Sequence, residues 1–295
     1  MARVADRLPE NMPGPLYVDA SCIDCDACRQ IAPQTFGDGD RSYVKHQPDD
    51  ELDWDRALMA LVTCPTSSIG VVGEKCDVAA ASRRFPEEIS AGVYYCGFAS
   101  EDSYGASSYL IRRPDGNVLV DSPRAARPLL ERIEELGGVR VMFLTHRDDV
   151  ADHAKFHARF GCERVLHRAD VGGDTRTVER QISGDGAVPL ADDLVVIPVP
   201  GHTRGSAALW YRAPGGETFL FSGDHLWASG DGEGLSASRG VCWYSWSKQT
   251  DSVERLLAHD FTWVLPGHGR RFHTDTDEEM RGALRSLVAR MRARH

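Results

Sequence analysis

The stretch Leu144–His153, LTHRDDVADH, places two histidines and three aspartates directly after an apolar run, VRVMF. Three later apolar runs end in a similar way: LVVIPVPG leads into His202, TFLFSG into Asp224 and FTWVLPG into His268. Open α/β sheets gather ligand-binding residues at strand ends, so side chains far apart in the chain can converge there. The pattern predicts that His146 and these three residues form a metal site at the edge of a sheet.

The order of these motifs, H-x-D...DH, GHTxGS, SGD and PGHG, resembles the metallo-β-lactamase fold superfamily over residues 92–275. The resemblance implies an α/β fold, an αββα sandwich with a metal site at one edge between the two sheets. It also implies that His146 belongs to the first histidine motif and His202 is the ligand of the middle motif. Asp224 would bridge two metals, and His268 would complete the second site. The superfamily contains hydrolases and oxidoreductases, so the fold does not define the reaction.

The first motif departs from the usual H-x-H-x-D-H. Asp148 replaces the second histidine, and the final Asp-His pair arrives two residues late, as Asp152-His153. In one interpretation the loop is longer, and Asp152 and His153 still reach the second metal. In another, a helix starts at Asp149, which caps it and shares a face with His153. In a third, Asp148 and Asp149 only cap the helix and His146 alone binds. We expect metal ligands at His146, Asp148, Asp152, His153, His202, Asp224 and His268.

The carboxylate at position 148 bears on metal identity. Replacing an imidazole by Asp148 makes the ligand set harder, which favours iron or manganese over zinc. Flavodiiron proteins of the same superfamily also have a carboxylate at this place. The expected cofactors are therefore two divalent metals, with iron favoured and zinc or manganese as alternatives.

A second group of ligands lies near the N-terminus. The motif Cys22-Ile-Asp-Cys25-Asp-Ala-Cys28 is followed, 36 positions later, by Cys64-Pro65. Three closely spaced cysteines and a distant fourth suit a 4Fe-4S cluster. Residues 15–75 resemble bacterial single-cluster ferredoxins, which implies that these four cysteines hold the cluster. The alternative is a zinc site or a set of unligated thiols.

Length and composition suggest two domains. The 295 residues, 42% of them hydrophobic, can bury a real core. We predict a ferredoxin-like iron-sulfur domain at residues 1–80, a linker at 81–90 and a metal-binding catalytic domain at 91–295. The formal net charge of −10 argues against nucleic-acid binding. The chain lacks a secretory signal and the roughly 18 consecutive apolar residues of a membrane span, so a cytoplasmic location and no membrane partner are expected.

The two ligand sets together suggest redox chemistry, because hydrolysis moves no electrons and would not need a cluster. The preferred hypothesis is an iron-dependent oxidoreductase or oxygenase in which the 4Fe-4S cluster relays electrons to a di-iron centre. Its partners would be a small-molecule substrate and a ferredoxin reductase or other electron donor. The first alternative is a zinc-type metallo-hydrolase of thioesters, esters or lactams, with a structural or sensing cluster. The second is a non-catalytic redox sensor or electron carrier.

Overall fold

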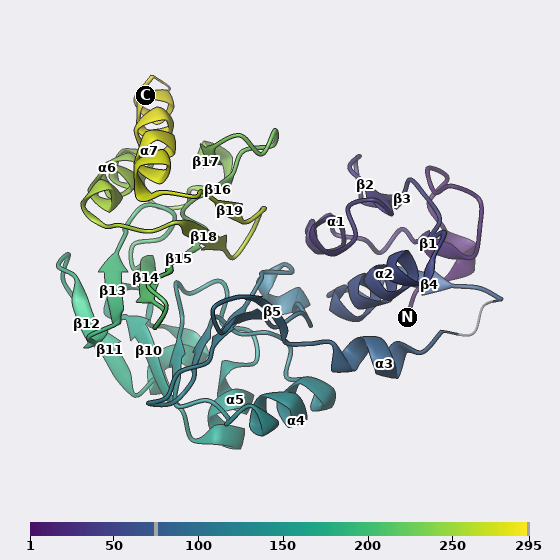
Figure 1. The fold of residues 1–295 in the computed structure, drawn as a ribbon, viewed down its shortest axis with the longest axis horizontal. Coiled ribbons are helices and arrows are strands. Elements are labelled where there is room, and N and C mark those ends of the chain that lie inside the picture. Colours follow the sequence, from purple (N-terminus) through teal and green to yellow (C-terminus); the bar gives the residue numbers. More distant parts are fainter. Residues whose placement is uncertain (74–75, 294–295) are drawn as a thin grey trace.

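The N-terminal part is a small α/β block. The computed structural model of the protein describes residues 1–73 and 76–293. In the block, two short antiparallel pairs of strands lie beside helices, to one side of the rest of the chain (Figure 1). Helix α2 begins after Asp50, whose side chain accepts a hydrogen bond from the Asp53 amide at 2.9 Å. The elements are β1 (Leu16–Val18), α1 (Ala27–Ile31), β2 (Phe36–Gly37), β3 (Tyr43–Val44), α2 (Glu51–Thr63), β4 (Ile69–Val71) and α3 (Val78–Arg83).

The larger part contains two sheets. The seven-stranded sheet has the order β11 (Arg180–Ile182), β10 (Glu163–His167), β9 (Val141–Phe143), β8 (Val118–Val120), β7 (Tyr109–Ile111), β6 (Val93–Tyr95), β5 (Glu87–Ser90). The six-stranded sheet has the order β12 (Val188–Ala191), β13 (Leu194–Pro198), β14 (Ala207–Arg212), β15 (Thr218–Gly223), β18 (Trp263–Pro266), β19 (Phe272–His273). Strands β8 to β11 run parallel to one another, as do β15 and β18. A separate hairpin pairs β16 (Trp227–Ala228) with β17 (Leu235–Ser236).

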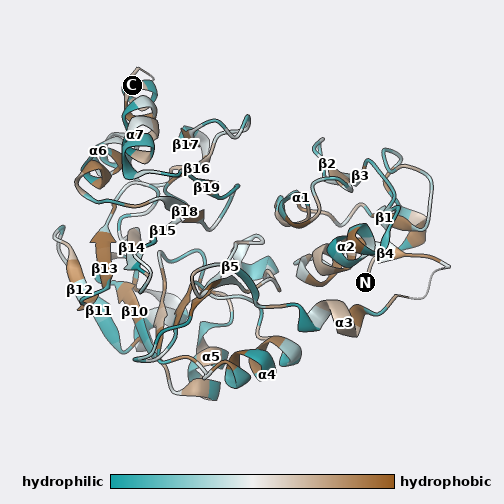
Figure 2. Ribbon diagram, in the orientation of Figure 1, coloured by the Kyte–Doolittle hydropathy of each residue, from teal (hydrophilic) through white to brown (hydrophobic). Residues whose placement is uncertain are grey.

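Helices cover the outer faces of both sheets. Helices α4 (Arg127–Glu135) and α5 (His153–Phe160) lie on one side of the sandwich, and α6 (Trp246–Arg255) and α7 (Asp277–Arg292) lie on the other (Figure 1). Hydrophobic residues concentrate on the strands, whereas the helices are hydrophobic on one side only (Figure 2). Leu129 and Ile133 of α4 join the main hydrophobic core, and Leu284 and Leu287 of α7 join a second core. The predicted αββα sandwich, preceded by a small block, is confirmed.

The predicted linker at residues 81–90 is structured. It contains the end of α3 and the whole of β5, which is the edge strand of the seven-stranded sheet. Arg56 of α2 forms an ion pair with Glu87 of β5, so this segment also contacts the N-terminal block. Among the described helices, none is both long and apolar enough to cross a membrane.

A buried hydrogen bond ties the two sheets together beside the predicted metal site. The Tyr109 hydroxyl of β7 donates to the Pro266 carbonyl of β18 at 2.7 Å, and its ring centroid lies 5.5 Å from that of Phe221 in β15. We expect Tyr109→Phe to lower the free energy of unfolding by about 1 kcal/mol, because a buried carbonyl loses its donor. Urea unfolding monitored by circular dichroism measures this. Tyr94→Phe, at a partly exposed position on β6, is the control and should change stability by less than about 0.5 kcal/mol. If both variants lowered the free energy of unfolding equally, the stabilising role of the Tyr109 hydrogen bond would be contradicted.

Candidate metal centre and cluster site

The four predicted strand-end residues converge on one place. His146 follows β9, His202 follows β13, Asp224 follows β15 and His268 follows β18. The Asp224 Oδ2 atom lies 3.8 Å from Nε2 of His146, 3.7 Å from Nε2 of His202 and 3.8 Å from Nε2 of His268. Three imidazoles from separate loops therefore face one carboxylate oxygen.

Asp148 and Asp149 complete the group on opposite sides. The Asp148 Oδ2 atom lies 3.5 Å from Nε2 of His202 and 3.9 Å from Nε2 of His146. Asp149 Oδ1 lies 3.8 Å from Nε2 of His268. Two sets of ligand atoms are each mutually within 4.8 Å: His146, Asp148 and His202, and His146, Asp149 and Asp224. Ligands about 2.1 Å from a tetrahedral ion lie roughly 3.4 Å apart, so these spacings are close to those of a metal site.

The burial of these atoms fits a metal as well. His146, His202 and Asp149 are almost completely buried. Within the described part of the chain, His146 Nε2, His202 Nε2, Asp149 Oδ2 and Asp224 Oδ1 are buried without a hydrogen-bond partner. Buried polar atoms are normally paired, because an unpaired one costs about 1–3 kcal/mol. Cations would satisfy all four atoms at once.

Carboxylate crowding shifts the pKa values of the group. Burial and the nearby Asp149 raise the pKa of Asp224 and hold the pKa of Asp121 well above its usual range. Burial lowers the pKa of His268, but Asp224 and Asp149 outweigh it and raise that pKa to about 9. The site therefore has excess negative charge, and without a metal it attracts a proton to His268.

The structure corrects two residues of the predicted ligand set. Asp152 is the N-cap residue of α5; its Oδ2 accepts from the Ala125 amide at 2.7 Å, and its Oδ1 pairs with Lys155 at 2.7 Å. His153 is buried elsewhere: its Nδ1 lies 3.1 Å from Arg164 and its Nε2 lies 3.5 Å from Asp174. Neither belongs to the groups of potential ligands found in the described chain. Asp149 takes the inward position instead and does not cap the helix.

Three further residues position the ligands and lack a signal in the sequence. Thr145 Oγ1 donates to the buried Asp121 at 3.0 Å and lies 2.9 Å from Nδ1 of His146. This arrangement places the His146 proton on Nδ1 and leaves Nε2 free to bind a metal. Asp170 accepts from the Arg147 amide at 3.1 Å and the Gly205 amide at 2.7 Å, so it ties the His146 loop to the His202 loop.

The four predicted cluster ligands line one cavity, together with Ser42 and Ser68. All four cysteines are free thiols, and burial raises the pKa of Cys22 and Cys28 and that of Cys25 to about 12. Buried thiols facing a common centre suit a cluster, whose iron would stabilise the thiolates. The Asp24 amide donates to Cys22 Sγ at 3.4 Å, and the Ser68 amide donates to Cys64 Sγ at 3.3 Å.

Arg29, which the sequence did not single out, braces the cysteine loop. Asp24 and Asp26 both have positive φ, at 57° and 66°, which are uncommon for residues other than glycine. Arg29 bonds to Asp24 at 2.6 Å, Asp26 at 2.5 Å and Ser42 at 2.8 Å. These bonds hold the loop in the shape that directs the cysteines inward.

The metal centre and the cysteine loop share one large pocket of about 1090 Å³. Cys25 and Asp148 are both in its wall. A Cβ atom on Gly105 would lie only 2.5 Å from Cβ of Cys25 and 2.8 Å from its Sγ, so this backbone directly covers the cluster site. The Tyr104 hydroxyl donates to the Ile23 carbonyl at 2.7 Å. The other lining residues are Asp24, Asp26, Asp102, Ser103, Tyr104, Arg147, Asp149, Val150, Ala151, Asp174, His202, Asp224, Trp227, Ser238, Val241, Trp243, His268 and Gly269.

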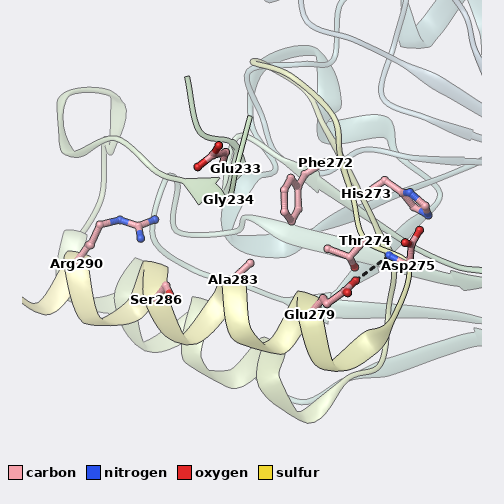
Figure 3. A pocket seen from close by; sticks show the side chains of 10 residues that line it. All are labelled: Glu233, Gly234, Phe272, His273, Thr274, Asp275, Glu279, Ala283, Ser286 and Arg290. Carbon is pink, nitrogen blue, oxygen red and sulfur yellow. Dashed lines mark hydrogen bonds between the residues drawn. The ribbon is translucent and has the colours of Figure 1, made fainter. Parts of the chain in front are cut away.

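Another cavity, of about 490 Å³, lies between α7 and the segments around β17 and β19 (Figure 3). Two of its charged side chains, Glu279 and Arg290, have structural partners. Glu279 accepts from the Asp275 amide at 3.0 Å in the N-terminal cap of α7, and Arg290 donates to the Leu235 carbonyl at 2.6 Å. It contains none of the candidate ligands.

Comparison with known proteins finds similarities for both parts of the chain. Residues 18–71 match the family model for the 4Fe-4S single cluster domain of Ferredoxin I. The chain is 33% identical to the hydroxyacylglutathione hydrolase of Rhodospirillum rubrum over 54% of this chain and 60% of that protein. It is 28% identical to the hydroxyacylglutathione hydrolase of Methylococcus capsulatus over 65% of this chain and 74% of that protein. For the first three such relatives, the alignment spans only 50–60% of the relative.

Solved structures agree on the fold alone. The crystal structure of VMB-1 has a TM-score of 0.50 and 16% identity, covering 68% of this chain and 95% of that one. A metallo-β-lactamase mutant from Cronobacter sakazakii has a TM-score of 0.49 and 19% identity, covering 70% of this chain and 93% of that one. The chain thus combines a segment that matches a single-cluster 4Fe-4S ferredoxin model with a sandwich that is similar to VMB-1 in fold and to hydroxyacylglutathione hydrolases in sequence.

Proposed function

We propose that the sandwich is a metal-dependent hydrolase of thioesters or related acyl compounds. The observation that carries the proposal is the position of Asp224, whose Oδ2 is nearly equidistant from the Nε2 atoms of three histidines. Relatives that are named hydroxyacylglutathione hydrolases support a hydrolytic reaction. This reverses the preference for an oxidoreductase that the sequence suggested, and favours the metallo-hydrolase that was its first alternative.

The residues would divide between two metal positions. His146, Asp148 and His202 would hold one divalent cation, Asp149 and His268 the other, and Asp224 would bridge them. Such cations lower the pKa of water and polarise a carbonyl group. Asp121 and Thr145 keep His146 in the tautomer that binds metal, and Asp170 fixes the distance between two ligand loops. With Asp148 in place of an imidazole, we infer that iron or manganese is preferred over zinc.

Substituting Asp149 tests this ligand set against the one expected from sequence. We expect Asp149→Asn to lose about one of the two metals and most thioesterase activity, because the second position then keeps only His268 and the shared Asp224. Asp152→Asn, a matched change three residues away, should keep both. Elemental analysis of the purified variants and a chromogenic thioester assay provide the measurements. Metal loss in Asp152→Asn with retention in Asp149→Asn would contradict the proposal.

Metal binding should depend on pH through His268. Its folded pKa of about 9 is above the unfolded value of roughly 6.5, so protonation stabilises the metal-free protein. This stabilisation of the metal-free protein by the His268 proton is fully present below about pH 6.5 and is lost as the pH rises through about 9. Because a metal binds neutral imidazole, affinity should increase from about pH 7 to about pH 9, with proton release near pH 7.

Calorimetry in buffers of different ionisation enthalpy measures both the affinity and the protons released. His46→Gln, which removes an exposed histidine outside the site, should retain the same pH profile. A wild-type affinity that stays constant between about pH 7 and about pH 9 would rule out the role assigned to His268.

The position of Cys25 favours a second candidate function, electron transfer between the cluster and iron in the sandwich. Cys25 and His268 line the same pocket, and the rings of Tyr104 and His268 lie 6.3 Å apart. In protein loaded with ferric iron, one-electron photoreduction of the cluster should then be followed by its reoxidation as sandwich iron becomes ferrous. Mössbauer and electron paramagnetic resonance spectra follow both sites. A cluster that stays reduced for as long as it does in protein whose sandwich is loaded with zinc, which accepts no electron, would leave hydrolysis as the only candidate.

A further inference from the structure

Exposed aromatic side chains gather around the pocket. Trp243 is 61% exposed, Tyr104 is 59% exposed and Tyr244 is 39% exposed. No other aromatic residue in the described chain is among its exposed large hydrophobic residues. Trp243 and Tyr104 line the pocket, as does the exposed Val241. Exposed apolar surface that is grouped beside a cavity indicates a binding site.

These aromatic rings flank both halves of the metal centre. The ring of Trp243 lies 6.1 Å from that of His202, and the ring of Tyr104 lies 6.3 Å from that of His268. The Tyr104 ring is anchored by its hydroxyl, which donates to the Ile23 carbonyl, and the backbone of Trp243 is fixed by its amide, which donates to the His202 carbonyl at 2.9 Å. Because the Tyr104 ring is held before a ligand arrives, binding against it costs less conformational entropy.

The charged groups of the pocket wall are mostly acidic. Apart from the candidate metal ligands, the wall contains Asp24, Asp26, Asp102 and Asp174 but only one basic residue, Arg147. Arg29 neutralises part of the charge of Asp24 and Asp26, yet its side chain is only 8% exposed and does not line the pocket. Arg204 lies over the Tyr244 ring, 5.2 Å from its centroid, and is likewise outside the wall. A cluster bound by four thiolates adds further negative charge beside Cys25.

We propose that this pocket selects acyl substrates that carry an aromatic group and are neutral or positively charged, and disfavours anionic ones. The inference rests on the proposed hydrolase function and specifies its substrate class. In the reaction, water adds to the acyl carbon, the carbon–sulfur bond breaks, and the products are a carboxylate, a thiol and a proton. The aromatic residues contribute stacking and cation–π contacts, and the acidic wall attracts positive charge and repels carboxylates. Glutathione thioesters, which are anionic, should therefore be poor substrates.

Three thioesters with the same phenylacetyl group test the charge preference. Their thiols are glutathione, N-acetylcysteamine and thiocholine, which are anionic, neutral and cationic. We expect kcat/KM for the thiocholine ester to exceed that for the glutathione ester by about tenfold or more at low salt, and the ratio to shrink as salt screens the wall. The double variant Asp102→Lys/Asp174→Lys should reduce the ratio. Asp115→Lys, an exposed position outside the pocket, should leave it unchanged.

Binding of the corresponding thioethers, which cannot be hydrolysed, provides a measurement independent of turnover. Quenching of tryptophan fluorescence should give the same order of Kd, and Trp243→Ala should weaken binding of phenylacetyl-type compounds more than acetyl-type ones. If no thioester is hydrolysed, the hydrolase proposal fails while the order of thioether Kd values still decides the specificity. If the glutathione compounds bind and react best, the specificity is overturned while the hydrolase function stands.

Discussion

The mutual repulsion of buried carboxylates is the constraint on which the catalytic end of the sandwich depends. Asp121, Asp149 and Asp224 lie close together, so the charge of Asp149 raises the pKa of both Asp121 and Asp224, and Asp121 and Asp149 are shielded from water. Such a group is costly unless positive charge is supplied. Three histidines face it, and the positive charge of a protonated His268 balances only part of it. The loops therefore bring more negative than positive charge together, and divalent cations bound there would balance it.

The sequence predicted the sandwich and the positions of His146, His202, Asp224 and His268, because each follows an apolar strand and the strand ends meet at one edge. It did not predict which aspartate of RDDVAD turns inward. Several turn conformations can connect a strand to a helix, and the spacing of residues in the sequence does not show which of them forms. Here Ala151 has a φ of 22°, and α5 begins only at His153, so the chain points Asp149 toward His268 and Asp152 toward Ala125. The local backbone conformation therefore determines which aspartate lies among the candidate metal ligands.

The supporting residues were harder to predict for a different reason. Asp121 and Asp170 act through hydrogen bonds to backbone amides more than twenty positions away, and nothing in their own neighbourhood of the sequence signals it. The aromatic residues of the segment 240–249, GVCWYSWSKQ, have different surroundings. Trp243 faces the pocket, whereas Trp246, three residues later, packs into the core beneath α7. Two tryptophans of one segment thus have different roles, one in the pocket and one in the core, and only their tertiary contacts distinguish these roles.

The backbone around Gly105 has a consequence for how freely the two parts can be exchanged. It touches Cys25 with no space for a side chain; nearby, the Ala99 amide bonds to the Thr63 carbonyl at 3.1 Å and Arg124 bonds to the Val62 carbonyl at 3.0 Å. The sandwich therefore recognises the end of α2 and the cysteine turn by their backbone shape. A ferredoxin transplanted from another protein would need the same turn and the same helix end before it could dock. A substitution that enlarges Gly105 or changes the turn at Cys25 therefore needs a compensating change in the other part.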